Sequence, residues 1–223
     1  MAEAARGWAS PDMGQPTRFV MVRHGQTADS VRHLFSGSGG TDPELTELGH
    51  RQAQHATQRV QASASGDDFS VLLASPMRRT QQTAHYLAEA LDLPIVTDDR
   101  LRECDFGEWE GYTMGEIVER YPHDAAAWMR DPECVPPGGE SLAAVRRRMQ
   151  SFREDVMSQY GGTNVLMVSH VTPIKSLLWE GLGEVDTVFY RLFLDLASIS
   201  VAEFYRDGGS TVRLVNYGGG VVA

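Results

Sequence analysis

The sequence predicts a three-layer α/β/α sandwich domain built around a mainly parallel mixed sheet. Three short runs dominated by apolar side chains are typical of buried strands, and they lie at 18–22, 69–74 and 164–169. Each precedes a segment with helical periodicity, and strands that alternate with helices favour a parallel sheet with helices on both faces. At 223 residues, the chain is long enough to bury one core of this kind.

The remaining helices follow in chain order. A glycine-rich loop at 25–43 leads to a helix that Thr46 is suited to cap and that ends near Ser63. Ser141 is suited to cap a long helix that ends at Tyr160. Further helices are expected at 77–91, 113–121 and 124–130, and after the strand at 164–169 with Thr172 as its cap and Pro173 at its first position.

Two further features complete the sheet and its ends. A short strand is expected at 94–97, and a hairpin of 197–205 and 211–217 around Asp207–Gly209. Residues 1–17 lack periodicity and predict a disordered leader or linker remnant, so the domain is expected at 18–217 with a flexible tail at 218–223. No apolar run is long enough to span a membrane or to form a secretory signal, which favours a cytoplasmic protein without a membrane partner.

Charge and composition exclude several kinds of partner. The net charge of −10 argues against a broad nucleic-acid surface, so no nucleic acid is expected to bind this domain. Any anion site must be local, and the basic residues are nearly all arginine, with Lys175 the only lysine. The histidine spacing fits no metal site, and Cys104 and Cys134 form no metal-binding cluster, so we predict no metal and no cofactor. Reduced thiols are the simpler expectation, with a disulfide left open.

Polar groups recur at the carboxyl ends of the three predicted buried strands. Arg23 and His24 follow the first strand, Ser75 and Arg79 follow the second, and His170 follows the third. Ligands of open α/β sheets bind beyond these strand ends. Two arginines and two histidines are therefore expected to converge there.

This set of side chains suits phosphoryl transfer. The transferring group spreads negative charge over three oxygens, and Arg23 and Arg79 each offer paired donors to them. A neutral imidazole at His24 can attack phosphorus, and neighbouring positive charge favours that neutral form. Gly25 lets the backbone approach a ligand. A general acid must protonate the leaving oxygen, and the loop at 101–112 offers Glu103, Asp105, Glu108 and Glu110.

Arg23-His24-Gly25-Gln26-Thr27 resembles the signature of the histidine phosphatase superfamily, whose fold is phosphoglycerate mutase-like. Segments 45–53, 75–83, 101–111 and 168–170 resemble further motifs of that family in the same order, within 18–217. One tripeptide is a weak signal, whereas four ordered matches at strand ends are specific. The resemblance implies that His24 forms a phosphohistidine and that Arg23, Arg79 and His170 hold the phosphoryl group. It also implies that Glu103 protonates the leaving oxygen and then activates water, with a best rate at acidic to neutral pH.

A closer likeness is to the acid phosphatase domain that follows a ribonuclease H domain in actinobacterial two-domain proteins, whose relatives include α-ribazole phosphatases. Segments 7–12, 35–42, 136–141, 169–175 and 190–198 carry it. It implies a chain fused to, or excised from, a ribonuclease H domain. The substrate is expected to be α-ribazole 5′-phosphate or another small phosphorylated metabolite. Its expected contacts are Gln26, Thr27, Ser30, Ser36, Gly37, Phe106 and Val171.

The superfamily often has Asn, Gln and Gly where this chain has Ser30, Ser36 and Val171, so the leaving group stays open. Two other functions also stay open: a phosphoglycerate mutase-type phosphotransferase, and a non-catalytic phosphatase-like scaffold. Core packing is the default expectation for the rings of Trp109 and Phe106, and a place at the substrate mouth stays open for them. The run Arg146–Arg148 is expected to form a solvated helix face.

Overall fold

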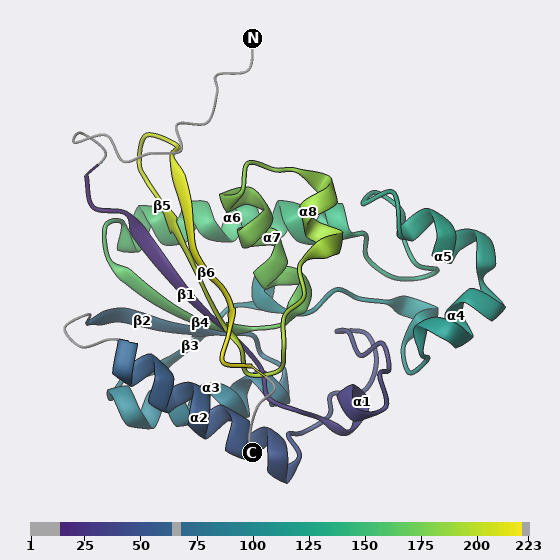
Figure 1. Cartoon of the computed structure of the whole chain (residues 1–223), viewed down its shortest axis with the longest axis horizontal. Coiled ribbons are helices and arrows are strands. Elements are labelled where there is room, and N and C mark those ends of the chain that lie inside the picture. The colour runs from purple at the N-terminus through teal and green to yellow at the C-terminus, as the bar shows by residue number, and fades with distance from the viewer. Residues whose placement is uncertain (1–13, 64–67, 220–223) are drawn as a thin grey trace.

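The computed structural model describes residues 14–63 and 68–219. The expected leader at 1–17 and tail at 218–223 therefore lie largely outside the described residues. Within those residues, six strands form one mixed sheet in the order β3-β2-β4-β1-β5-β6 (Figure 1). The strands are β1 Thr17–Arg23, β2 Phe69–Ala74, β3 Ile95–Thr97, β4 Asn164–Ser169, β5 Ile199–Phe204 and β6 Ser210–Tyr217.

Strand directions confirm the mainly parallel mixed sheet and the C-terminal hairpin. β1, β2, β3 and β4 pair in parallel, whereas β5 runs antiparallel to both β1 and β6. The α-helices are α1 Ala28–Val31, α2 Glu47–Ser63, α3 Arg78–Leu91, α4 Met114–Arg120, α5 Pro122–Trp128, α6 Leu142–Tyr160, α7 Val171–Gly181 and α8 Asp186–Arg191. Two 3₁₀ turns, η1 Asp99–Leu101 and η2 Gly107–Trp109, lie in the loop at 101–112 or just before it.

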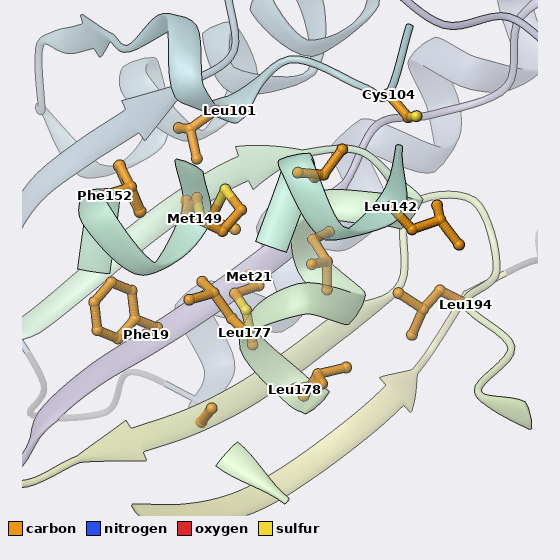
Figure 2. Close-up of a cluster of buried hydrophobic side chains, with 14 of the residues drawn as sticks. Phe19, Met21, Leu101, Cys104, Leu142, Met149, Phe152, Leu177, Leu178 and Leu194 are labelled. Carbon is orange, nitrogen blue, oxygen red and sulfur yellow. The ribbon is translucent and has the colours of Figure 1, made fainter. Parts of the chain in front are cut away.

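The central strand β1 divides the core into two layers. Phe19 and Met21 pack in a core with α6 and α7, whereas Val20 and Val22 pack in a second core with α2 and α3. This alternation arises because successive side chains of a strand point to opposite faces. Figure 2 shows the first core, in which Met21 lies close to Leu177 of α7. Both faces of the sheet are thus covered, as the sequence predicts.

The segment between β3 and α6 packs against the glycine-rich loop and α1 to one side of the sheet (Figure 1). An isolated bridge joins Leu34 to Thr113. The Phe35 ring packs edge-on against Phe106 and Trp128, with centroids 4.8 and 6.0 Å apart. Edge-to-face packing of this kind stabilises aromatic clusters. These rings provide the apolar wall of the cavity described below.

The predicted start of α7 is wrong. The helix begins at Val171 with His170 as its N-cap residue, so Thr172 and Pro173 lie inside the first turn. The Thr172 N–H, which would otherwise lack a helical partner, donates to the Glu103 carboxylate at 3.2 Å. A side chain distant in sequence therefore provides what a local cap residue was expected to provide.

The expected solvated face at Arg146–Arg148 is also wrong for two of its three residues. The Arg146 guanidinium is buried over the Trp179 ring, 4.1 Å from its centroid, and Arg148 is mostly buried against Glu140. Arg147 alone of the three is exposed. Successive side chains on α6 point about 100° apart, so the three residues do not share one face of the helix. Two short helices, α1 and α8, have no counterpart among the sequence predictions.

Candidate active site

Parallel pairing brings the predicted residues to one edge of the sheet. Arg23 at the end of β1 is in register with Ser169 at the end of β4, and Ala74 of β2 is in register with Val168. The His24 N–H continues this pairing by donating to the Ser169 carbonyl at 3.1 Å. The residues after all three strands consequently meet beyond their carboxyl ends.

A cavity of about 670 Å³ opens at this edge. Arg23, His24, Arg79 and Glu103 line it. The expected substrate contacts Gln26, Thr27, Ser30, Ser36, Phe106 and Val171 also lie on its wall. Two predicted residues do not line it, His170 and Gly37. The Gly37 N–H instead donates to the Glu110 carboxylate at 2.8 Å, so this amide already has a partner.

The His24 imidazole is neutral and has a defined tautomer. Its Nδ1 lies 2.8 Å from the Gly25 carbonyl oxygen, which can only accept, so Nδ1 carries the proton. Nε2 is left with a free lone pair. Burial, with the charges of Arg79 and Arg23, holds the pKa of His24 well below its ordinary value of 6.5. This histidine is therefore equipped as a nucleophile.

The backbone around His24 is held by a close glycine pair. A Cβ on Gly25 would collide with the Gly49 carbonyl, and a Cβ on Gly49 would collide with the Gln26 carbonyl. The Gln26 N–H also donates to the Gln52 side chain at 2.9 Å. Only glycine allows the β1 loop to approach the start of α2 this closely. The first motif and the segment at 45–53 are thus parts of one structure.

Arg23 and Arg79 each carry a buried donor that makes no hydrogen bond within the described part of the chain. Arg23 donates to the Leu194 carbonyl at 2.5 Å and Arg79 to the Ser36 carbonyl at 2.9 Å. Yet Nε of Arg23 and Nη1 of Arg79 are buried without a hydrogen-bond partner among the described residues, and the nearest anion to Nη1 is the exposed Asp42 carboxylate in a long ion pair at 3.8 Å. Burial is the main cause that lowers the pKa of Arg23 to about 10 and also lowers that of Arg79. Such donors are costly unless an acceptor meets them, so the pair is suited to an anion.

His170 lies behind the cavity wall, not on it. The ring is fully buried, with its centroid 5.1 Å from that of His24. Arg79 Nε–H donates to its Nδ1 at 3.3 Å, so the ring proton is on Nε2, which lies 2.9 Å from the Ser75 hydroxyl. Burial, then the charge of Arg79, holds the pKa of His170 well below its ordinary value. In this geometry His170 orients the guanidinium of Arg79.

Glu103 is a buried carboxylate on the cavity wall beside both arginines. It is 6% exposed, and its oxygens accept from the backbone N–H groups of Cys104 at 2.8 Å and Thr172 at 3.2 Å. Its charge is the main influence that opposes the lowering of the pKa of Arg23 and Arg79. A carboxyl group fixed in this way can exchange a proton with a group bound at the arginines.

The structure adds three residues that sequence reasoning did not assign to the site. Ser75 meets His170, Lys175 lines the cavity, and Arg148 donates to the Glu103 carbonyl at 3.2 Å. Ser75 had a usable signal, because it stands directly at a strand end. Arg148 had none, since its role depends on α6 packing against the loop at 101–112.

Apolar side chains also line the cavity. They belong to Phe35, Phe106, Trp128, Leu142, Phe189 and Tyr190. Among the described residues, no group of three or more His, Cys, Asp or Glu side chains could hold a metal ion. No helix in the described ranges is long and apolar enough to cross a membrane.

An open α/β sheet with buried arginines and a neutral imidazole beyond its strand ends defines a class of phosphate-handling proteins. The chain belongs to the histidine phosphatase superfamily (branch 1), whose family model matches residues 19–217. It is 46% identical over 213 residues to the bifunctional protein Rv2228c of Mycobacterium tuberculosis, a match that covers 96% of this chain and 57% of that protein. The chain thus spans little more than half the length of this relative.

Two further relatives have more specific names. Phosphoserine phosphatase 1 of Hydrogenobacter thermophilus is 34% identical over 185 residues, covering 82% of this chain and 85% of that protein. The crystal structure of the α-ribazole phosphatase of Shigella flexneri superimposes with a TM-score of 0.77 at 26% identity, covering 93% of this chain and 100% of that one. The phosphoglycerate mutase-like fold expected from the sequence is therefore confirmed.

Proposed function

We propose that the protein is a metal-independent phosphate-monoester hydrolase of the acid phosphatase type that acts through a phosphohistidine on His24. The observation that carries this proposal is the neutral His24 ring, with a free Nε2 lone pair, beside two arginines that each have a buried donor without a hydrogen bond among the described residues. Family membership supports the same chemistry. The free thiols of Cys104 and Cys134 support a cytoplasmic setting.

The first step transfers the phosphoryl group to the enzyme. Nε2 of His24 forms a bond to phosphorus as the bond between phosphorus and the leaving oxygen breaks. Arg23 and Arg79 neutralise the charge on the transferring oxygens, which is the main requirement of such a transfer. Glu103 donates its proton to the leaving oxygen, so the product departs as a neutral alcohol.

The second step releases phosphate. The Glu103 carboxylate takes a proton from a water molecule, whose oxygen forms a bond to phosphorus while the bond to His24 breaks. Inorganic phosphate leaves, and both His24 and Glu103 return to their starting protonation states. One acid thus serves in both half-reactions, as microscopic reversibility requires.

The substrate is a small phosphorylated metabolite. The cavity volume of about 670 Å³ and its aromatic wall provide room for an alcohol much larger than the phosphate itself. The names of the relatives define a first panel: α-ribazole 5′-phosphate and phosphoserine. A fused ribonuclease H domain is part of the same proposal, and the bifunctional relative supports it.

The test is hydrolysis of p-nitrophenyl phosphate with a chelator present, comparing the parent with His24→Ala. The matched control is His55→Ala, because His55 is exposed on α2 and outside the cavity. We expect activity that survives the chelator, is kept in the control and is lost in His24→Ala. Activity lost to the chelator would overturn metal independence, and a parent that transfers phosphate to an added alcohol faster than it releases phosphate would be a mutase.

If the parent hydrolyses no ester of the panel, the non-catalytic phosphatase-like scaffold becomes the alternative to test. Orthovanadate, an analogue of phosphate, distinguishes a hydrolase that rejects these esters from a scaffold without a working phosphate site. A ligand that binds only the folded state raises the melting temperature of the protein. We expect vanadate to stabilise the parent and not the variant Arg79→Ala.

A further inference from the structure

Lys175 is the single lysine of the chain, and it lines the cavity. It belongs to α7, whose residues Ile174, Leu177 and Leu178 are buried in the core. This packing fixes the helix and directs the neighbouring Lys175 side chain toward the cavity wall. Its location is therefore set by the same helix that follows His170.

The Lys175 ammonium group makes no hydrogen bond and no ion pair among the described residues. Its nitrogen lies 5.8 Å from the centroid of the Phe189 ring. Burial is the main cause that lowers the pKa of this lysine, and the charge of Glu103 opposes the shift. A half-buried cation without a counter-ion is unusual, because burial of an unpaired charge is costly.

The carboxylates of Asp195 and Glu103, which line the same cavity, already accept hydrogen bonds from other groups. Asp195 on the cavity wall accepts from the Asn216 amide at 2.9 Å and interacts with the charge of Arg23. Glu103 accepts backbone N–H groups from Cys104 and Thr172. Neither carboxylate forms an ion pair with Lys175, so its charge is available to a ligand.

The phosphate does not need this cation. Arg23 and Arg79 each already present a donor that makes no hydrogen bond in the described part of the chain. The aromatic wall, which includes Phe106, Trp128 and Phe189, lines the rest of the same cavity. A substrate that contacts all three features has a phosphate at one end, an apolar or ring-containing middle, and a group that suits an ammonium ion.

We propose that Lys175 binds a second anionic group, a carboxylate or a second phosphate, on the alcohol part of the substrate. This inference rests on the proposed hydrolase function and narrows its substrate class. It favours phosphate esters of acids, such as phosphoserine, over α-ribazole 5′-phosphate, whose alcohol carries no such anion. A charge-assisted hydrogen bond in a partly buried site contributes about tenfold to hundredfold in affinity.

The kinetic test uses three phosphate esters with the same aromatic frame. They are 3-carboxyphenyl, 3-phosphonophenyl and the uncharged 3-carbamoylphenyl phosphate. Their kcat/KM values are compared in the parent, in Lys175→Met and in Lys175→Arg. We expect the ratio of an anionic ester to the carbamoyl ester to fall about tenfold to hundredfold in Lys175→Met and to recover in Lys175→Arg. Whichever anionic ester shows the larger fall identifies carboxylate or phosphate.

Equal losses for all three esters would overturn the inference, because Lys175 would then act on the transferred phosphate or on Glu103. Lack of hydrolysis of every ester by the parent would count against the proposed function itself, and a binding measurement still decides the role of Lys175. Protein labelled with ¹³C at the lysine Cε gives a single side-chain resonance, because the chain has one lysine.

The ligands for this measurement are phenylphosphonate and 3-carboxyphenylphosphonate, which cannot be hydrolysed. We expect the carboxylated ligand to shift the resonance and to raise the pKa of Lys175, and phenylphosphonate to leave both nearly unchanged. Equal shifts with the two ligands, or no shift with either, would contradict the assignment.

Discussion

Arg79 donates its Nε–H to Nδ1 of His170 at 3.3 Å, and the opposite ring nitrogen of His170 lies 2.9 Å from the Ser75 hydroxyl. The neutral ring is thereby fixed between a cation and a hydroxyl. Since His170 is fully buried and does not line the cavity, this chain of contacts acts on the anion site through Arg79. The geometry of one guanidinium thus depends on a histidine 91 residues away.

Arg79→Lys should lower kcat/KM by about 10²- to 10³-fold, the loss typical when one fixed donor to a transition state is removed. Lysine keeps the charge but cannot contact both the Ser36 carbonyl and His170 while presenting a further donor. The measurement is p-nitrophenyl phosphate hydrolysis. Arg78→Lys is the control, because Arg78 is adjacent, exposed and directed to Glu44. Equal effects of the two changes would argue against a specific role of Arg79.

Glu103→Gln should lower kcat/KM, which reports the phosphorylation step alone, by about 10²- to 10⁴-fold for esters of alkyl alcohols and much less for p-nitrophenyl phosphate. A nitrophenolate is stable enough to leave without a proton, whereas an alkoxide must be protonated as it leaves. Glutamine keeps an acceptor for the Cys104 and Thr172 amides, so the fold should persist. Glu108→Gln is the control from the same loop, since Glu108 is exposed and accepts from the Tyr121 hydroxyl. A uniform loss of kcat/KM across leaving groups would rule out proton donation.

Acidification should destabilise the protein below about pH 6.5, the value at which an unfolded histidine gains its proton. The folded pKa values of His24 and His170 lie well below this, so the unfolded chain binds more protons and stability falls as pH falls. Each histidine contributes a slope of about 1.4 kcal/mol per pH unit. Urea unfolding of the parent and of His24→Asn between pH 5 and 7 measures how the free energy of unfolding changes with pH.

The raised pKa values of Glu110 and Glu180 act in the opposite direction. They are common to parent and variant, so the difference between the two slopes isolates His24. We expect a smaller slope in His24→Asn and an unchanged one in His55→Asn. Parallel curves for all three proteins would mean that His24 is not buried in its neutral form.

Arg148→Met should lower the free energy of unfolding by about 1–3 kcal/mol and reduce activity in the same esters that depend on Glu103. Arg148 joins the Glu140 carboxylate to the carbonyls of Arg100 and Glu103. Arg147→Met, which removes an exposed pair with Glu133, should change stability by less than about 1 kcal/mol. Chemical denaturation and the leaving-group series check both. A loss of stability without a leaving-group effect would limit Arg148 to a structural role.

Much of the fold could be predicted from periodicity alone. The strands at 69–74 and 164–169 have the predicted bounds, because buried parallel strands are short and continuously apolar. Errors arose where a long-range contact replaced a local signal. Thr172 looked like a helix cap, and its N–H is instead satisfied by Glu103. Arg146 looked solvated, and it stacks on Trp179 of another helix.

The site shows the same division. Their positions after strand ends predicted that Arg23, His24 and Arg79 lie close together, and in the structure all three line one cavity. Sequence could not place His170 behind Arg79, because that depends on how α3 meets the end of β4. It also could not show that Gly37 donates to Glu110, since the two belong to loops that are 73 residues apart.

The sequence by itself determined the alternation of strands and helices, the strand ends that carry the arginines and histidines, and the absence of a second lysine. These are properties of composition and of local pattern, which neighbouring residues specify. The tertiary structure alone decided which donors are left without partners, the tautomers of both histidines, and the unpaired state of Lys175. Those depend on burial and on contacts between distant segments, and both arise only when the layers pack together.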